Sequence, residues 1–432
     1  MFDLARVNAL LDEVVRPVIE GRVRSIVGLA IRASIPTVRL GEVVEIARKG
    51  MPALQAEVVG FELDDAMLVP FGEVDGIAAD DTVRTRGRGH RITCGPALLG
   101  RVLDGLGAPM DGGPPIEGVA WDVMRPPPSP LTRPRITRVL PLGVRALDAL
   151  FTTGEGQRVG LFAGSGVGKS ALLGQIARNA DADVFVICLI GERGREVREF
   201  LEDALGERGR ARSVVVCATS DVPAMVRKKS AYVATAVAEY FRAQGKRVVL
   251  AMDSVTRFAR AGREVGLAAG ELPVRRGFPP SIFAELPRLL ERSGTSNEGS
   301  ITAFYTVLVE GNDMDEPVSD EVRGILDGHI VLSRAQAERG HYPAIDTRKS
   351  LSRMMDSLVS TEHREAAQTL RAHLALYESK RDLITLGVYK HGSEPKLDHV
   401  LARLDAIEAF LRQRPTDESD FNATLATLSR VI

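Results

Sequence analysis

The chain has 432 residues, which is too long for one hydrophobic core and predicts two or three domains. Its 56 basic and 57 acidic side chains give a net charge of −1, so there is no electrostatic reason to expect a nucleic-acid partner. Cys94, Cys188 and Cys217 are too few and too widely spaced for a disulfide framework or a Cys-x-x-Cys metal site, and they favour a reducing compartment.

The start of the chain predicts a short amphipathic helix. One helical face carries Leu4, Val7, Leu11 and Val14, so this helix either docks on a partner or packs on its own domain. The segment is acidic where a secretory signal would be basic, and no apolar run in the chain approaches the roughly 18 residues that span a bilayer. A soluble cytoplasmic protein is therefore expected.

The next part, residues 20–85, consists of short alternating segments broken by glycines. This pattern predicts a small antiparallel β barrel or sandwich, so residues 1–85 form the first predicted domain. The stretch at 121–135 is dense in proline and includes most of the run "RPPPSPLTRPRI". Such a sequence makes a poor core, so a covering linker is expected here.

From about residue 135 to 350, β-branched runs alternate with helical stretches. The runs are "RVGLFA", "DVFVICLI", "SVVVCAT", "RVVLAMD" and "SITAFYTVLV", which predict a parallel sheet with helices on both faces. Beyond residue 350 the pattern is helical almost throughout. The predicted fold is thus multidomain: an N-terminal β barrel, a central α/β phosphate-loop domain at 86–350, and an all-α domain at 351–432.

The segment "LFAGSGVGKSALL" at 161–173 predicts a phosphate loop between a strand and a helix. Ala163 stands where the strict G-x-x-x-x-G-K-[ST] pattern has glycine, and the remaining positions fit. Backbone N–H groups of such a loop converge on phosphate oxygens, while Lys169 neutralises the β- and γ-phosphates and the Ser170 hydroxyl ligates Mg²⁺. The residues expected to bind ATP are Gly164, Ser165, Gly166, Val167, Gly168, Lys169, Ser170 and Ala171.

Two more strands end in carboxylates that phosphoryl transfer to water would need. Asp253 ends "RVVLAMD", at the edge of the sheet where open α/β folds bind ligands, and is a candidate magnesium ligand or alternatively a helix cap. Glu192 ends "ICLIGE" and could polarise the attacking water. Glu196 follows one helical turn later, either in the site or in a salt-bridged surface helix.

Six motifs in this order resemble the ATPases of type III secretion, flagellar and injectisome alike, which are cousins of the catalytic subunits of rotary ATP synthases. They are "GSGVGKS", "GERGREV", "AMDSVTRFA", "RGFPPSIFAELPRLLERSG", "GSITAFYTVLVEGNDMDEPVSDEVRGILDGHIVLSR" and "GHYPAIDTRKSLSR". The resemblance extends to "LITLGVYKHGSEPKLD" near residue 390, and its most specific part runs from 277 to 353.

The resemblance implies a RecA-like central domain and a role for several residues. Glu192 becomes the general base, with Arg257 nearby, and Ser170 and Asp253 lie around Mg²⁺. Apart from the resemblance, Glu196 is a further candidate magnesium ligand. Tyr342 resembles a wall of the adenine pocket. Arg353 resembles an arginine finger that reaches into a neighbouring subunit's site, where it would stabilise charge that develops in the transition state.

The resemblance also implies partners and a location. Because base and finger lie on one polypeptide, identical copies could complete one another's sites in a homo-hexameric ring. The expected activity is ATP hydrolysis coupled to protein export, releasing or unfolding chaperone-bound substrates at the helical tail. The other implied partners are a stator-like regulator at the N-terminal helix, a central-stalk protein and, indirectly, a membrane export gate. The implied location is the cytoplasmic face of the inner membrane.

Several alternatives stay open at this point. A hexameric nucleic-acid translocase also joins a barrel to a phosphate-loop domain, but it should carry exposed aromatics, and residues 20–85 hold only Phe61 and Phe71. A rotary synthase subunit is the third reading, and the flagellar and injectisome systems are not distinguished. The segment at 261–281, which includes Phe278, is expected to line the ring's central channel.

Overall fold

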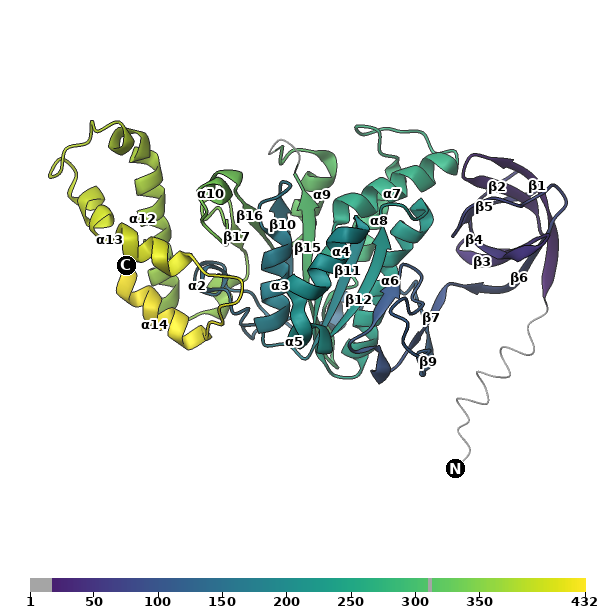
Figure 1. The fold of residues 1–432 in the computed structure, drawn as a ribbon, viewed down its shortest axis with the longest axis horizontal. Helices are drawn as coiled ribbons and strands as arrows, with labels where there is room; N and C mark the ends of the chain where they lie inside the picture. Colours follow the sequence, from purple (N-terminus) through teal and green to yellow (C-terminus); the bar gives the residue numbers. More distant parts are fainter. Residues whose placement is uncertain (1–17, 310–312) are drawn as a thin grey trace, which may run out of the picture.

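The computed structural model describes residues 18–309 and 313–432. The predicted amphipathic helix with Leu4, Val7, Leu11 and Val14 lies outside these ranges. The described chain is elongated, with a barrel at one end, a large sheet in the middle and a helical region at the other end (Figure 1).

The N-terminal part is a closed antiparallel barrel with the strand order β1-β2-β5-β4-β3-β6. Alternate residues such as Ile31, Val44 and Leu68 fill its interior, as the period of two requires. The strands are β1 (Ile19–Val27), β2 (Ala30–Ser34), β3 (Glu42–Arg48), β4 (Met51–Glu62), β5 (Asp65–Pro70) and β6 (Thr82–Gly89). The predicted barrel is confirmed, and closure rather than a sandwich removes its sheet edges.

A buried contact joins the barrel to the central part. Val69 and Phe71 pack against Met225 and Val226 in one apolar cluster. Phe71 is therefore buried, so it is not available to stack on a base.

The chain then crosses to the central part through short elements. They are β7 (Arg91–Cys94), which pairs with β9 (Val119–Asp122), the turn η1 (Pro96–Leu98), β8 (Val102–Asp104) and the turn η2 (Pro130–Thr132).

The central sheet has the order β17-β16-β10-β15-β13-β11-β12-β8, with β14 paired to β15. Its strands run parallel except β14 and β17. Beyond β8 they are β10 (Arg158–Ala163), β11 (Val184–Glu192), β12 (Ser213–Thr219), β13 (Arg247–Asp253), β14 (Gly294–Thr295), β15 (Ser300–Leu308), β16 (Gly328–Leu332) and β17 (Leu351–Ser352). All five predicted runs are strands of this sheet, because each is buried on both faces and reads as a continuous apolar segment.

Helices cover both faces of the sheet, as predicted. Leu172 and Ile176 of α3 join one core, while Val237 of α6 and Phe258 of α7 join the other. The helices are α2 (Arg145–Leu150), α3 (Lys169–Asn179), α4 (Gly194–Glu199), the π-helical turn η3 (Phe200–Leu205), α5 (Gly206–Ala211), α6 (Ala224–Ala243), α7 (Val255–Ala268), α8 (Pro280–Leu290), α9 (Pro317–Ile325) and α10 (Arg334–Glu338).

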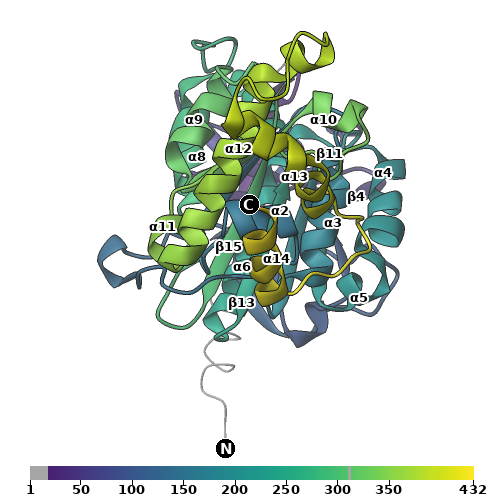
Figure 2. The same cartoon turned by 90° about the vertical axis from the view of Figure 1, so that its left-hand side faces the viewer.

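The C-terminal region is all helical after β17, as predicted. It comprises α11 (Met355–Leu358), α12 (Thr361–Thr385), α13 (Pro395–Leu411) and α14 (Phe421–Val431). These helices pack on α2, where Ile407, Phe410 and Leu428 join the apolar core of the central part. Figure 2 looks along the molecule from this helical end.

Candidate functional site

The phosphate loop lies between the end of β10 and the start of α3. Gly166 and Gly168 adopt φ angles of +77° and +91°, the left-handed conformation that favours glycine. Ala163 is the last residue of β10, and its methyl group is buried in the core. The departure from the strict phosphate-loop pattern therefore falls on a strand residue, where a small apolar side chain packs.

Lys169 and Asp253 form a close ion pair beneath the loop. Lys169 Nζ lies 2.5 Å from Asp253 Oδ1 and 3.9 Å from Glu192 Oε1. Asp253 also accepts a hydrogen bond of 2.8 Å from the hydroxyl of Thr306 on β15, a neighbouring strand that sequence reasoning did not connect with it. Because the Asp253 side chain is only 4% exposed, this carboxylate depends on these two partners.

Glu192 sits at the end of β11 against Arg257 of α7. Arg257 Nη1 lies 2.6 Å from Glu192 Oε1 and donates to the Gly191 carbonyl at 2.6 Å. Burial raises the pKa of Glu192 to about 7, helped by a hydrogen bond with Glu196 and the charge of Asp253, while the Lys169 and Arg257 charges oppose the rise. The same hydrogen bond lowers the pKa of Glu196. A carboxyl poised near neutrality is suited to accept a proton from water.

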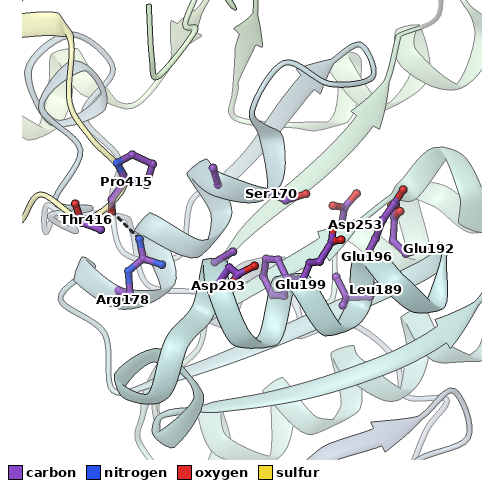
Figure 3. Close-up of a pocket in the computed structure, with 13 residues that line it drawn as sticks. Ser170, Arg178, Leu189, Glu192, Glu196, Glu199, Asp203, Asp253, Pro415 and Thr416 are labelled. Carbon is purple, nitrogen blue, oxygen red and sulfur yellow. Dashed lines mark hydrogen bonds between the residues drawn. The ribbon is translucent and has the colours of Figure 1, made fainter. Parts of the chain in front are cut away.

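The carboxylates of Glu192 and Asp253 face a cavity of about 560 Å³ beside α3 (Figure 3). Ser170, Glu192, Glu196 and Asp253 line one end of it, together with Leu189. The other end is lined by residues that include Arg178, Asp203, Pro415 and Thr416.

Pro415 and Thr416 come from the loop between α13 and α14, and sequence reasoning missed them. Arg178 Nη2 donates to the Pro415 carbonyl at 2.6 Å and holds this loop against α3. The segment is polar and irregular, so no periodicity or motif marked it as part of the cavity.

The cavity offers the oxygen donors that Mg²⁺ prefers. Ser170 supplies a hydroxyl, and Asp253 and Glu196 supply carboxylates. In the described part of the chain, no three His, Cys, Asp or Glu side chains cluster as a complete metal site. Mg²⁺ at nucleotide sites keeps several waters and takes phosphate oxygens, so one or two protein ligands fit this ion.

The Tyr342 ring lies over the phosphate loop. A Cβ atom built on Gly168 would come within 3.2 Å of two ring carbons, which is a tight contact, and the φ angle of +91° at this position favours glycine. The Gln413 N–H donates to the Tyr342 carbonyl at 2.9 Å, which joins this position to the same C-terminal loop. The structure thus places Tyr342 beside the phosphate loop.

Arg353 is the one predicted catalytic residue that lies apart from the others. It follows β17 at the amino end of the sheet, where its N–H donates to the Asp327 carbonyl at 3.0 Å and Asp327 in turn binds the start of β10. The phosphate loop follows the opposite, carboxyl end of β10. The six residues of this strand separate its two ends by about 20 Å. Arg353 is exposed and cannot reach its own phosphate loop.

The expectation that Phe278 lines a channel is wrong for that residue. Phe278 is 4% exposed and packs against Phe283, with the Arg263 guanidinium over its ring. The exposed apolar side chains of the loop between α7 and α8 are Leu272 and Val274. The prediction rested on the glycines and prolines of the segment and on its place after β13, which indicate a loop but not which of its side chains is buried.

Over the ranges that the structure describes, no helix is long and apolar enough to cross a membrane.

Comparison with known proteins gives consistent matches over nearly the whole chain. Residues 143–352 match the ATP synthase alpha/beta family, nucleotide-binding domain, and residues 359–430 match the T3SS EscN ATPase C-terminal domain. The type 3 secretion system ATPase of Xanthomonas euvesicatoria is 54% identical over 414 residues, which cover 95% of this chain and 93% of that protein. The flagellum-specific ATP synthase of Bacillus subtilis is 47% identical over 412 residues, covering 95% and 94%.

A solved structure agrees with these matches. The assembled ATPase EscN from the type III secretion system of enteropathogenic E. coli superposes with a TM-score of 0.90 at 46% identity. The match covers 95% of this chain and 99% of that one. EscN has also been solved in complex with its central stalk EscO, and that structure gives a TM-score of 0.88.

Proposed function

Because this chain belongs to the family of type 3 secretion system ATPases and flagellum-specific ATP synthases, we propose that it hydrolyses Mg²⁺-bound ATP to drive protein export. The observation that carries the proposal is the convergence of Lys169, Asp253 and Glu192 beneath a phosphate loop. Relatives from both the type 3 secretion and the flagellar systems match the chain, so the proposal covers both.

The residues of the site divide the chemistry among them. Lys169, now paired with Asp253, would bind the β- and γ-phosphates of ATP, and Asp253 would then be free to hold Mg²⁺ together with Ser170 and Glu196. Bound Mg²⁺ supplies positive charge to the phosphate oxygens. Glu192 accepts a proton from the attacking water, and Arg257 holds that carboxylate in place. Tyr342, whose ring lies beside Gly168, would form a wall of the adenine pocket.

The position of Arg353 supports a shared site between copies. An arginine that neutralises transition-state charge raises the rate by about 10³ to 10⁵, and here it must come from another chain. A head-to-tail arrangement that closes on itself makes a ring, in which each copy offers Arg353 to the next. The similar EscN structure is that of an assembled ATPase, and a homo-hexamer is the ring we propose for this chain.

The remaining partners follow from the relatives. We place a central-stalk protein in the ring, by analogy with the EscN–EscO complex. The helical tail α12–α14 would meet chaperones and their cargoes, and residues 1–17 would meet a stator-like regulator. Such a complex would sit on the cytoplasmic face of the inner membrane, below an export gate.

A nucleic-acid translocase is not favoured. Of the two barrel aromatics, Phe71 packs against the central part of the chain and only Phe61 is exposed, which leaves no stacking platform. The relatives named above are secretion and flagellar ATPases, which also argues against a rotary synthase subunit.

The test is turnover of ATP by the purified chain with Mg²⁺, with EDTA, and after Lys169→Ala. We expect activity only in the first case. Adding a type III chaperone–cargo complex should then give ATP-dependent release of cargo, which Lys169→Ala abolishes. ATP turnover without any effect on such complexes would leave an ATPase and refute the export step.

A further inference from the structure

The proline-rich segment at 126–134 is a projecting loop that the proposed chemistry does not use. In Figure 2 it stands out from the body on the side of α11, away from α3 and α4. Leu131 sits in its short turn η2 and is 97% exposed. Prolines at 126–128, 130 and 134 restrict the backbone on both sides of this leucine.

One partly buried guanidinium anchors this loop. Arg133 Nη1 donates to the Ser293 carbonyl at 2.8 Å, and Nη2 donates to the Glu291 carbonyl. Thr295 Oγ1 donates to the Pro134 carbonyl at 2.7 Å. Gly294 has φ +111°, and a Cβ there would lie 2.8 Å from Arg133 Nη1, so glycine makes room for the anchor. The loop is therefore held rigidly, and Leu131 is presented in a fixed place.

A chain of charges connects the anchor to Arg353. Arg133 Nη2 lies 3.4 Å from Glu291 Oε2, and Glu291 also pairs with Arg158. Arg158 Nε lies 3.1 Å from Asp327 Oδ2, and the Asp327 carbonyl receives the Arg353 N–H. The loop that carries Leu131 and the residue Arg353 are thus linked by one network of ion pairs and hydrogen bonds at one edge of the molecule.

The nucleotide cavity lies on the other side. Figure 2 places α3 and α4, which border the cavity, on the side opposite α11 and the loop. In a head-to-tail ring, the edge that carries Arg353 faces the cavity side of the next copy. Leu131 belongs to the same edge, so the surface that would cover it is a second copy of this chain.

We propose that the 126–134 loop is an intersubunit contact in which Leu131 packs on the neighbouring copy and fixes the position of Arg353 at that copy's site. The proposal rests on the ring of the proposed function. It adds a contact residue far from both the phosphates and the barrel, with the charge network as the link to the finger.

The experiment compares Leu131→Ser with Leu386→Ser, a matched control that removes a leucine 74% exposed at the end of α12. Assembly is followed by sedimentation velocity with Mg²⁺ and a non-hydrolysable ATP analogue over a range of protein concentrations. Losing a buried leucine contact should weaken each interface about tenfold to a hundredfold. Leu386→Ser should assemble like wild type, and both variants should keep the monomer's melting temperature because neither side chain packs in the core.

A second readout reports contact directly. All three native cysteines are buried, so Leu131→Cys gives a single reactive thiol for an environment-sensitive fluorophore. Its emission should shift to the blue as rings form. Rings that form normally with Leu131→Ser, or a label that stays in water within the ring, would overturn this contact and leave the proposed function intact. A wild-type chain that never assembles would overturn the ring and this contact together.

Discussion

The pH dependence of hydrolysis follows from the surroundings of Glu192. The pKa of this carboxyl is raised to about 7, first by burial and then by its hydrogen bond with Glu196. A general base must be deprotonated, so activity is lost as pH falls through this pKa. With a pKa near 7, the deprotonated fraction rises from about 9% at pH 6 to about 91% at pH 8, which predicts a roughly tenfold rise in kcat/KM.

Glu196→Gln separates the hydrogen bond with Glu196 from the other causes that raise the pKa of Glu192. Removing the Glu196 carboxylate takes away an interaction that raises the pKa of Glu192, so the acid limb of the profile should move to lower pH. Burial remains, so the limb should not reach that of a free glutamate. The control is Glu199→Gln, which lines the same cavity but is not among the groups that shift Glu192.

Steady-state ATPase rates between pH 5.5 and 8.5, about the range over which the base titrates, provide the assay. Wild type and variants share the same nucleotide, so titration of ATP itself cancels in the comparison. A flat profile, or an equal shift in both variants, would refute the role given to Glu192.

Three further predictions concern the phosphate loop and the core. Lys169→Met should lower the free energy of unfolding by about 3 kcal/mol in thermal unfolding without nucleotide, because it leaves the buried Asp253 carboxylate without its cationic partner. Adding Asp253→Asn should restore most of this stability. Equal stability of the single and double variants would contradict the prediction. Gly168→Ala should raise the Kd for a fluorescent ATP analogue at least tenfold, since the new methyl meets the Tyr342 ring and φ is +91°, whereas unchanged binding would exclude this geometry. In the buried core, Arg292 donates two hydrogen bonds to the carboxylate of Glu239 on α6, at 2.9 and 2.7 Å. Arg292→Met should therefore cost about 3 to 5 kcal/mol in urea unfolding, because it leaves the Glu239 carboxylate buried without its partner, and a loss below about 1 kcal/mol would show that the pair is dispensable.

The sequence predicted those features that depend on local pattern. Buried parallel strands read as apolar runs, so the ends of β11 and β13, and hence Glu192 and Asp253, could be placed at one edge of a sheet. The glycine spacing before Lys169 is typical of a phosphate loop, so the phosphate-binding residues could also be predicted.

The features that escaped prediction depend on contacts between distant segments. Thr306 reaches Asp253 only because β13 and β15 are neighbours in the sheet, and strand order cannot be read from apolar runs. Pro415 reaches the cavity because the helical tail folds back onto α3. Phe278 was misplaced because glycine and proline content indicates a loop but not which of its side chains is buried.

The most direct test of the central claim is to mix two inactive variants. Glu192→Gln lacks the base and Arg353→Ala lacks the finger, and in a ring each interface takes one residue from each copy. Specific ATPase activity should rise with protein concentration for wild type, and the mixture should recover part of the activity that each variant lost. Activity that is independent of concentration, a harmless Arg353→Ala, or a mixture no more active than its parts would contradict a site shared between copies.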